Sequence, residues 1–118
     1  MSTMSSFSEK GLLGELEQLV LLAAQGLGEG AYAVSIRDEI EARTGISLGR
    51  SSAYVTLDRL ERKGYVASRM GDPTPERGGK AKRCFTITAA GTRALATAHA
   101  AIARMRGERP PRTARSTR

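Results

Sequence analysis

The stretch that most constrains this chain is residues 49–65, which read GRSSAYVTLDRLERKGY. At 100° per residue, Ala53, Leu57 and Leu60 fall on one narrow apolar stripe of a helix. The opposite side carries hydroxyl, valine and arginine side chains: Ser51, Ser52, Val55, Arg59 and Arg62. Gly64 suits the end of this helix, because glycine readily adopts the left-handed conformation needed there. The pattern predicts a helix that packs by one side and presents the other to a partner.

The charge is distributed unevenly along the 118 residues. Residues 11–48 contain two basic and six acidic side chains, a net charge of −4. Residues 50–118 contain sixteen basic and five acidic side chains, a net charge of +11. The basic half therefore begins where the amphipathic helix begins, which favours a polyanionic partner such as DNA. A merely solvated basic surface is the alternative.

The composition predicts one domain with an aliphatic core, because the chain is short and only 4% of its residues are aromatic. Its single cysteine, Cys84, excludes an intramolecular disulfide and fits a reducing compartment. The longest apolar run, residues 19–24, is far shorter than the roughly 20 residues that span a bilayer. Residues 1–10 lack the apolar centre of a signal peptide. We therefore expect a cytoplasmic protein with no membrane segment.

Helical spacing of apolar side chains predicts two helices before the amphipathic one. The first covers residues 12–27, after which a glycine-rich stretch breaks it. The second covers residues 32–43, with Tyr32, Ile36 and Ile40 facing inward. The helix over residues 32–43 and the amphipathic helix that follows it are joined by a tight turn, and the amphipathic helix bears the polar and basic face. This arrangement is typical of a helix-turn-helix.

After Gly64 the spacing becomes alternating, which predicts two strands, one near residues 66–71 and one near residues 84–88. The segment between them, GDPTPERGGKAK, contains two prolines and five charged side chains and therefore predicts a hairpin loop. A basic hairpin after a helix-turn-helix is typical of a wing. Cys84 is expected on the outer side of its strand. Phosphate or minor-groove contacts are expected from Arg77, Lys80, Lys82 and Arg83.

Thr88 is predicted to cap a last helix over residues 89–106. Side chains along this helix follow the spacing of a coiled-coil seam, and so small a domain has little core left for them to cover. The stripe therefore predicts a dimerisation helix that packs against the first helix of a second copy. The expected interface residues are Leu12, Leu16, Leu95, Ala98, Ile102 and Met105.

The predicted fold class is mostly α with a small β-hairpin: a winged helix-turn-helix followed by a C-terminal dimerisation helix. The expected parts are a flexible N-terminus over residues 1–10, a winged helix-turn-helix DNA-binding domain over residues 11–88, the dimerisation helix over residues 89–106 and a disordered basic tail over residues 107–118.

The order of elements resembles the PadR family of winged-helix transcriptional regulators, in its short form with a single C-terminal helix. The segments that carry the resemblance are LGELEQLVLLAA, AYAVSIRDEIEARTG, SSAYVTLDRLERKGYV and PTPERGGKAKRCFTITAAG. The resemblance implies a homodimeric, cytoplasmic repressor whose last helix dimerises. The sequence departs from the family's usual pattern at Ser51, Val55, Cys84 and Ala89. Ser51 and Val55 lie on the exposed face, so they bear on the operator sequence more than on DNA binding itself.

The candidate DNA-binding residues are Arg50, Ser51, Ser52, Tyr54, Val55, Arg59, Arg77, Lys80, Lys82 and Arg83. Ser51, Ser52 and Val55 are the candidates for base contacts, Val55 through a thymine methyl group. Tyr54 lies at the edge of the apolar stripe, where its ring can cover the core while its hydroxyl reaches a phosphate. Arg59 either contacts DNA or is solvated, and the sequence leaves both open.

No metal site, cofactor or catalytic site is predicted, because one cysteine and one histidine cannot close a zinc site and no phosphate-binding loop spacing occurs. We expect a non-enzyme, a sequence-specific repressor that acts as a homodimer on double-stranded DNA with a pseudo-palindromic operator. Two alternatives stay open. One is a winged helix that binds another protein instead of DNA, and the other is a sensor whose small-molecule effector binds between the first and last helices of the dimer.

Overall fold

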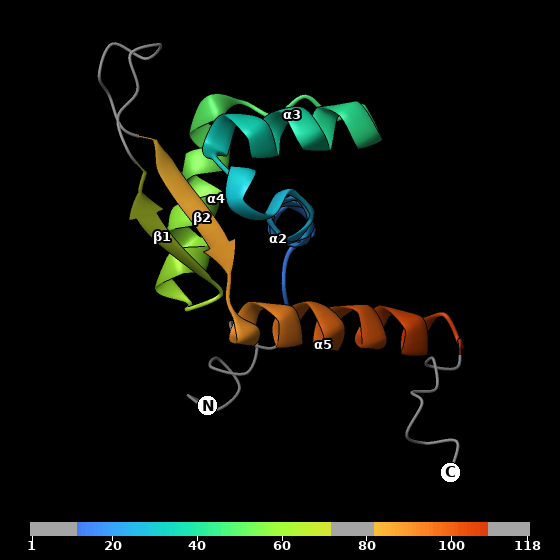
Figure 1. Ribbon diagram of the computed structural model, residues 1–118. Helices are drawn as coiled ribbons and strands as arrows, with labels where there is room; N and C mark the ends of the chain where they lie inside the picture. The colour runs from blue at the N-terminus through green and yellow to red at the C-terminus, as the bar shows by residue number, and fades with distance from the viewer. Residues whose placement is uncertain (1–11, 72–81, 109–118) are drawn as a thin grey trace.

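The computed structural model describes residues 12–71 and 82–108 (Figure 1). The elements in chain order are α2 (Glu15–Leu27), a 3₁₀ turn η1 (Gly28–Gly30), α3 (Ala33–Thr44), α4 (Arg50–Arg62), β1 (Val66–Met70), β2 (Arg83–Ile87) and α5 (Ala89–Met105). Within these residues the structure is mostly helical with an antiparallel hairpin, which confirms the predicted fold class. The predictions for residues 1–10, for Arg77 and Lys80 and for most of the tail lie outside the described residues.

The core lies between α2, α3, α4 and the hairpin, with α5 packed below α2 (Figure 1). Its largest fully buried side chains come from all of these elements except α5: Val20, Leu21, Ile36, Leu57, Leu60 and Phe85. Aliphatic side chains dominate the set, as the low aromatic content predicted. Leu57 and Leu60 belong to the stripe of α4 that the sequence assigned to the core, so α4 packs by the predicted side.

Local chemistry explains where the helices end. α3 is followed by Gly45 at a φ of 78°, and α4 is followed by Gly64 at a φ of 83°. After α4, the Tyr65 amide donates to the Leu60 carbonyl at 2.9 Å and the Gly64 amide donates to Glu61 at 2.9 Å, which together form a Schellman motif. These bonds satisfy the last carbonyls of α4 and turn the chain directly into β1.

The hairpin pairs Val66 with Ile87 at its base and Met70 with Arg83 at its loop end. A second neighbour lies along the other edge of β2, where Tyr32 forms an isolated bridge with Cys84. The predicted outer position of Cys84 is wrong: the side chain is buried, and its thiol donates to the Glu29 carbonyl at 3.4 Å. The segment around Tyr32 covers Cys84, whereas its neighbour Phe85 points to the opposite face and is buried in the hydrophobic core.

The stripe on α5 is divided between the core and the surface. Leu95 and Ala98 are 4% and 3% exposed within a single chain, whereas Ile102 and Met105 are 45% and 88% exposed. The whole stripe was expected to lie outside the core and to be free for a second copy. This is wrong for Leu95 and Ala98, which pack against the core of their own chain. Figure 1 shows the reason, since α5 passes below α2 before its C-terminal half continues beyond it.

The start of α5 is anchored on the turn after α4. The Thr88 hydroxyl accepts from the Gly91 amide at 3.1 Å, which confirms the predicted cap, and also donates to the Gly64 carbonyl at 2.7 Å. A Cβ added at Gly91 would overlap the Tyr65 carbonyl oxygen and lie 2.9 Å from the Ile87 side chain. Only glycine allows the helix to approach the turn this closely.

We expect Gly91→Ala to destabilise the fold by about 1–3 kcal/mol, because backbone and side chain must shift to admit the new methyl group. The matched control is Gly26→Ala in α2, where a Cβ meets nothing within 4 Å. That control should stabilise the fold by about 0.5–1 kcal/mol, because alanine loses less conformational entropy in a helix. Urea unfolding of the two variants measures both effects. Equal effects would contradict the close packing at Gly91.

Candidate nucleic-acid interface

The exposed face of α4 is the one that the sequence assigned to a partner. Ser51, Ser52, Arg59 and Arg62 are exposed, and Val55 is 53% exposed. The stripe of Ala53, Leu57 and Leu60 on the other side is fully buried. A half-exposed valine between small hydroxyl side chains and arginines is a surface able to enter a DNA groove. We call the exposed set Ser51, Ser52, Val55, Arg59 and Arg62 the reading face.

The turn that precedes α4 is fixed by a side chain of α3. The Arg37 guanidinium of α3 donates through Nε to the Leu48 carbonyl at 2.9 Å. The Thr44 hydroxyl accepts from the Ile46 amide at 3.0 Å in the same turn. These bonds hold the two helices of the helix-turn-helix at a set separation, so the reading face is supported from behind by α3.

Tyr54 lies beside the reading face on the side of the hairpin. It shares a stripe with Asp58 and Glu61, four and seven residues further along α4, which places the three side chains on one edge of the helix. The Tyr54 side chain is exposed. Its position at the edge of the buried stripe is the one that the sequence predicted.

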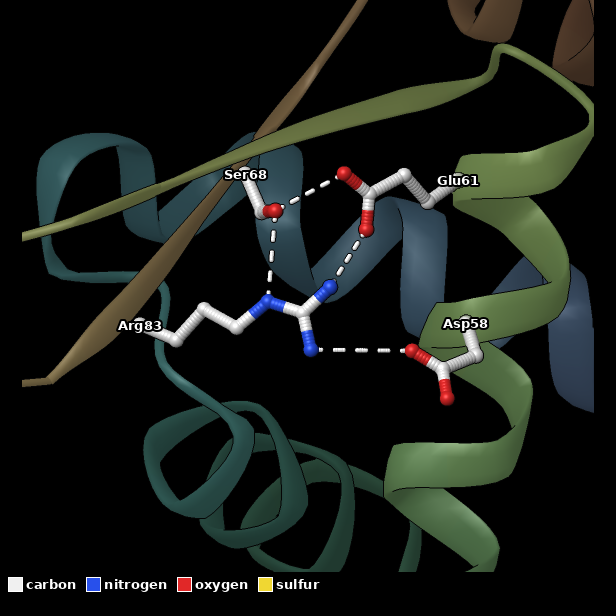
Figure 2. A network of polar contacts seen from close by, with 4 residues as sticks. All are labelled: Asp58, Glu61, Ser68 and Arg83. Carbon is white, nitrogen blue, oxygen red and sulfur yellow. Dashed lines mark hydrogen bonds and ion pairs between the residues drawn. The ribbon is translucent and has the colours of Figure 1, made fainter.

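The two described cations of the predicted wing differ in their surroundings. The Lys82 ammonium lies 4.2 Å from the ring centre of Tyr32, close to the loop end of the hairpin. Arg83, for which a DNA contact was predicted, makes several contacts within the protein. Figure 2 shows its guanidinium directed at Ser68 on β1 and at two carboxylates of α4, Asp58 and Glu61. Three of its nitrogens already have partners.

The acidic side of this contact was not predicted from the sequence. Asp58 and Glu61 stand three residues apart on the otherwise basic helix, outside its apolar stripe, and that spacing is the signal that could have indicated a cation facing them. Arg69 was not predicted either; it is exposed on β1 and adds a cation to the outer side of the hairpin. Among the described residues of the hairpin, Arg69 is thus an exposed cation and Lys82 a half-buried one.

A groove of about 300 Å³ lies between α2 and α3. It is lined by Leu19, Leu22, Ala23, Gly26, Glu39, Ile40, Arg43 and Thr44. An ion pair between Glu39 and Arg43, with Nε and Oε2 3.0 Å apart, forms part of its wall. This groove is not the place expected for an effector, which the sequence analysis put between the first and last helices of a dimer.

Within residues 12–71 and 82–108, no three His, Cys, Asp or Glu side chains lie together in a way that could hold a metal ion. None of the helices in these ranges is both long enough and apolar enough to cross a membrane.

A helix-turn-helix, a basic hairpin and an exposed recognition helix define the class of winged-helix DNA-binding proteins. The chain belongs to the PadR-like family of transcriptional regulators, whose sequence profile matches residues 20–97. Family membership and fold together support a role in DNA-binding transcription regulation. No curated protein matches the sequence.

Solved structures of several regulators share the fold. A PadR-like transcription factor from Bacteroides fragilis is 19% identical, with a TM-score of 0.68 and coverage of 91% of this chain and 94% of that one. A PadR family regulator from Eggerthella lenta is 25% identical, with a TM-score of 0.61 and coverage of 90% and 85%. A PadR family regulator from Clostridium difficile is 18% identical, with a TM-score of 0.63 and coverage of 80% and 92%.

Proposed function

We propose that this protein is a cytoplasmic transcriptional repressor that binds a pseudo-palindromic operator as a homodimer. The observation that carries the proposal is the reading face of α4. Its apolar stripe is fully buried, while Val55 and the hydroxyls of Ser51 and Ser52 remain open to solvent at the N-terminal end. The first turns of a recognition helix are the part that reaches base edges in the major groove. Bound there, the protein would block transcription by occupying the site.

Phosphate contacts are proposed on the reading face itself and on the surfaces beside it. Arg50 and Arg59 are exposed on α4, and Tyr54 is exposed on the edge nearest the hairpin. Arg69 and Lys82 extend the cationic surface onto the hairpin. Arg77 and Lys80, which lie outside the described residues, remain proposed contacts on the basis of the sequence. The winged helix that binds only another protein is the less favoured function, because such a surface does not need these cations.

The homodimer is proposed on the exposed end of α5. Ile102 and Met105 are apolar and exposed, and Leu12, ahead of α2, is also exposed. Apolar side chains of this size are favourable to bury against the same surface of a second copy across a two-fold axis. Two copies of α4 would then face one side of the duplex, with half-sites about 10 base pairs or a multiple of that distance apart. Leu16 is half-buried, and Leu95 and Ala98 would support the interface from beneath.

We expect Ser52→Ala to change the preference among operator variants, because a hydroxyl that bonds a base edge is lost. The binding free energy should fall by about 1–3 kcal/mol on the preferred sequence and should hardly change on a sequence altered at the contacted base pair. The matched control is Tyr54→Phe, which removes one hydroxyl from the same helix and should weaken all sequences alike. Binding to a panel of duplexes, drawn from a random library by the wild-type protein, measures both. Uniform weakening by Ser52→Ala would move that residue to the DNA backbone.

A further inference from the structure

We infer that Glu61, Ser68 and Arg83 form a brace that sets the position of the hairpin relative to α4, and that sequence-specific DNA binding depends on this brace. The inference rests on the proposed function, because it concerns how two DNA-contacting elements are held together. Glu61 and Arg83 act here as positioning residues that need not touch DNA themselves.

The brace is a closed ring of polar contacts among three elements (Figure 2). Arg83 Nη2 on β2 lies 2.5 Å from Glu61 Oε1 on α4. The other carboxylate oxygen of Glu61 accepts from the Ser68 hydroxyl on β1 at 2.8 Å, and that hydroxyl accepts from Arg83 Nε at 3.2 Å. Each member therefore bonds the other two. A ring of this kind fixes the orientation of each side chain more firmly than a single ion pair does.

The guanidinium of Arg83 is also held in place by its surroundings. Arg83 Cζ lies 5.0 Å from the ring centre of Phe85, which is fully buried. The side chains of Arg83 and Glu61 are only 36% and 34% exposed. Exposed ion pairs contribute little, because solvent screens them and their side chains lose freedom. Partial burial of Arg83 and Glu61 reduces the screening by solvent. Stacking on Phe85 reduces the loss of side-chain freedom, because the guanidinium is already ordered there.

The position of the brace in the hairpin suggests what it does. β1 follows α4 directly through the turn at Gly64, so the base of the hairpin is tied to the helix by the chain itself. Arg83 stands at the opposite, loop end of β2, paired with Met70. A bond from this end back to Glu61 restrains the part of the hairpin that the turn does not hold. Arg69 and Lys82, next to it, are thereby kept at a constant distance from the reading face.

A second carboxylate on the same stripe provides a matched comparison. Asp58 is 50% exposed, and its oxygen lies 3.6 Å from Arg83 Nη1 without joining the ring. On charge alone, removing either carboxylate from a helix that binds DNA should strengthen binding, since DNA is a polyanion. The brace predicts opposite signs: loss of Asp58 removes repulsion and one longer ion pair outside the ring, whereas loss of Glu61 opens the ring.

The test compares Glu61→Ala with Asp58→Ala on two probes of equal length, the duplex that the wild-type protein selects from a random library and an unselected random-sequence duplex. We expect Glu61→Ala to bind the selected duplex about tenfold more weakly, because hairpin side chains must then be ordered on binding, and the unselected duplex no more weakly than wild type. Asp58→Ala should bind both duplexes at least as tightly as wild type. Tighter binding of the selected duplex by Glu61→Ala would overturn the inference.

A second measurement examines the brace without DNA. Amide hydrogen exchange of β1 and β2 in the free protein should accelerate about tenfold in Glu61→Ala and stay unchanged in Asp58→Ala. The double variant Glu61→Arg with Arg83→Glu swaps the two charges and keeps the net charge of the protein. It should restore slow amide hydrogen exchange. Unchanged exchange in Glu61→Ala would show that there is no brace. If the wild-type protein selected no duplex, the proposed function would fail together with the brace's role in binding, whereas the exchange result would still decide whether the ring holds the hairpin.

Discussion

Leu95→Asp is expected to unfold the protein, whereas Ile102→Asp is expected to leave it folded but monomeric. Both residues lie on one stripe of α5, yet Leu95 is 4% exposed and Ile102 is 45% exposed in a single chain. An unpaired carboxylate in the core costs about 4 kcal/mol or more, a large part of the stability of a small domain. At Ile102 the same carboxylate is solvated in the monomer and becomes costly only when a second copy covers it.

Circular dichroism and sedimentation equilibrium separate the two effects. The matched control is Thr97→Asp, which adds the same charge at an exposed position on another side of α5 and should change neither the fold nor the dimer. The expected series is an unfolded Leu95→Asp, a folded monomeric Ile102→Asp and a folded dimeric Thr97→Asp. A monomeric wild-type protein, or a dimeric Ile102→Asp, would contradict dimerisation through α5.

Val55→Asp is expected to weaken binding to every DNA sequence by about 100-fold, corresponding to about 2.7 kcal/mol. Val55 stands in the middle of the reading face and is 53% exposed, so the carboxylate is solvated in the free protein. On DNA it would be desolvated in the groove and brought close to the phosphates. The stability of the free protein should change by less than about 0.5 kcal/mol, since the position makes no core contact.

Ala42→Asp is the matched control for the added charge. Ala42 is exposed on α3, outside the reading face, so this variant has the same net charge as Val55→Asp. Its affinity for DNA should fall less than about threefold, because screening weakens a charge that lies more than about 8–10 Å from the phosphates. Fluorescence anisotropy with a labelled duplex measures both variants. Similar losses in the two would place the DNA on a surface other than α4.

Local chemistry made much of the fold predictable from the sequence. Gly45 and Gly64 adopt the left-handed conformation that ends a helix, and Thr88 caps the helix that follows it. The buried stripe of α4 follows from its spacing alone, because a helix repeats every 3.6 residues whatever surrounds it. The reading face was predictable for the same reason.

The errors arise where a residue's environment depends on elements distant in the sequence. Alternation in β2 could not indicate that the segment around Tyr32 covers its second edge, so Cys84 was placed outside. The spacing of α5 could not indicate how far α2 extends over it, so Leu95 and Ala98 were assigned to an interface alone. The contact of Arg83 with Glu61 was not predicted, because it depends on how the hairpin lies against α4.

The most direct measurement is methylation interference on the duplex that the wild-type protein selects, because N7 of guanine is reached only from the major groove. We expect interference in two patches related by pseudo-two-fold symmetry, about 10 base pairs or a multiple of that distance apart. The same experiment with Val55→Asp instead of the wild-type protein should show neither patch. A single patch without symmetry would contradict the dimer, and undisturbed binding to the methylated duplex would contradict a recognition helix in the major groove.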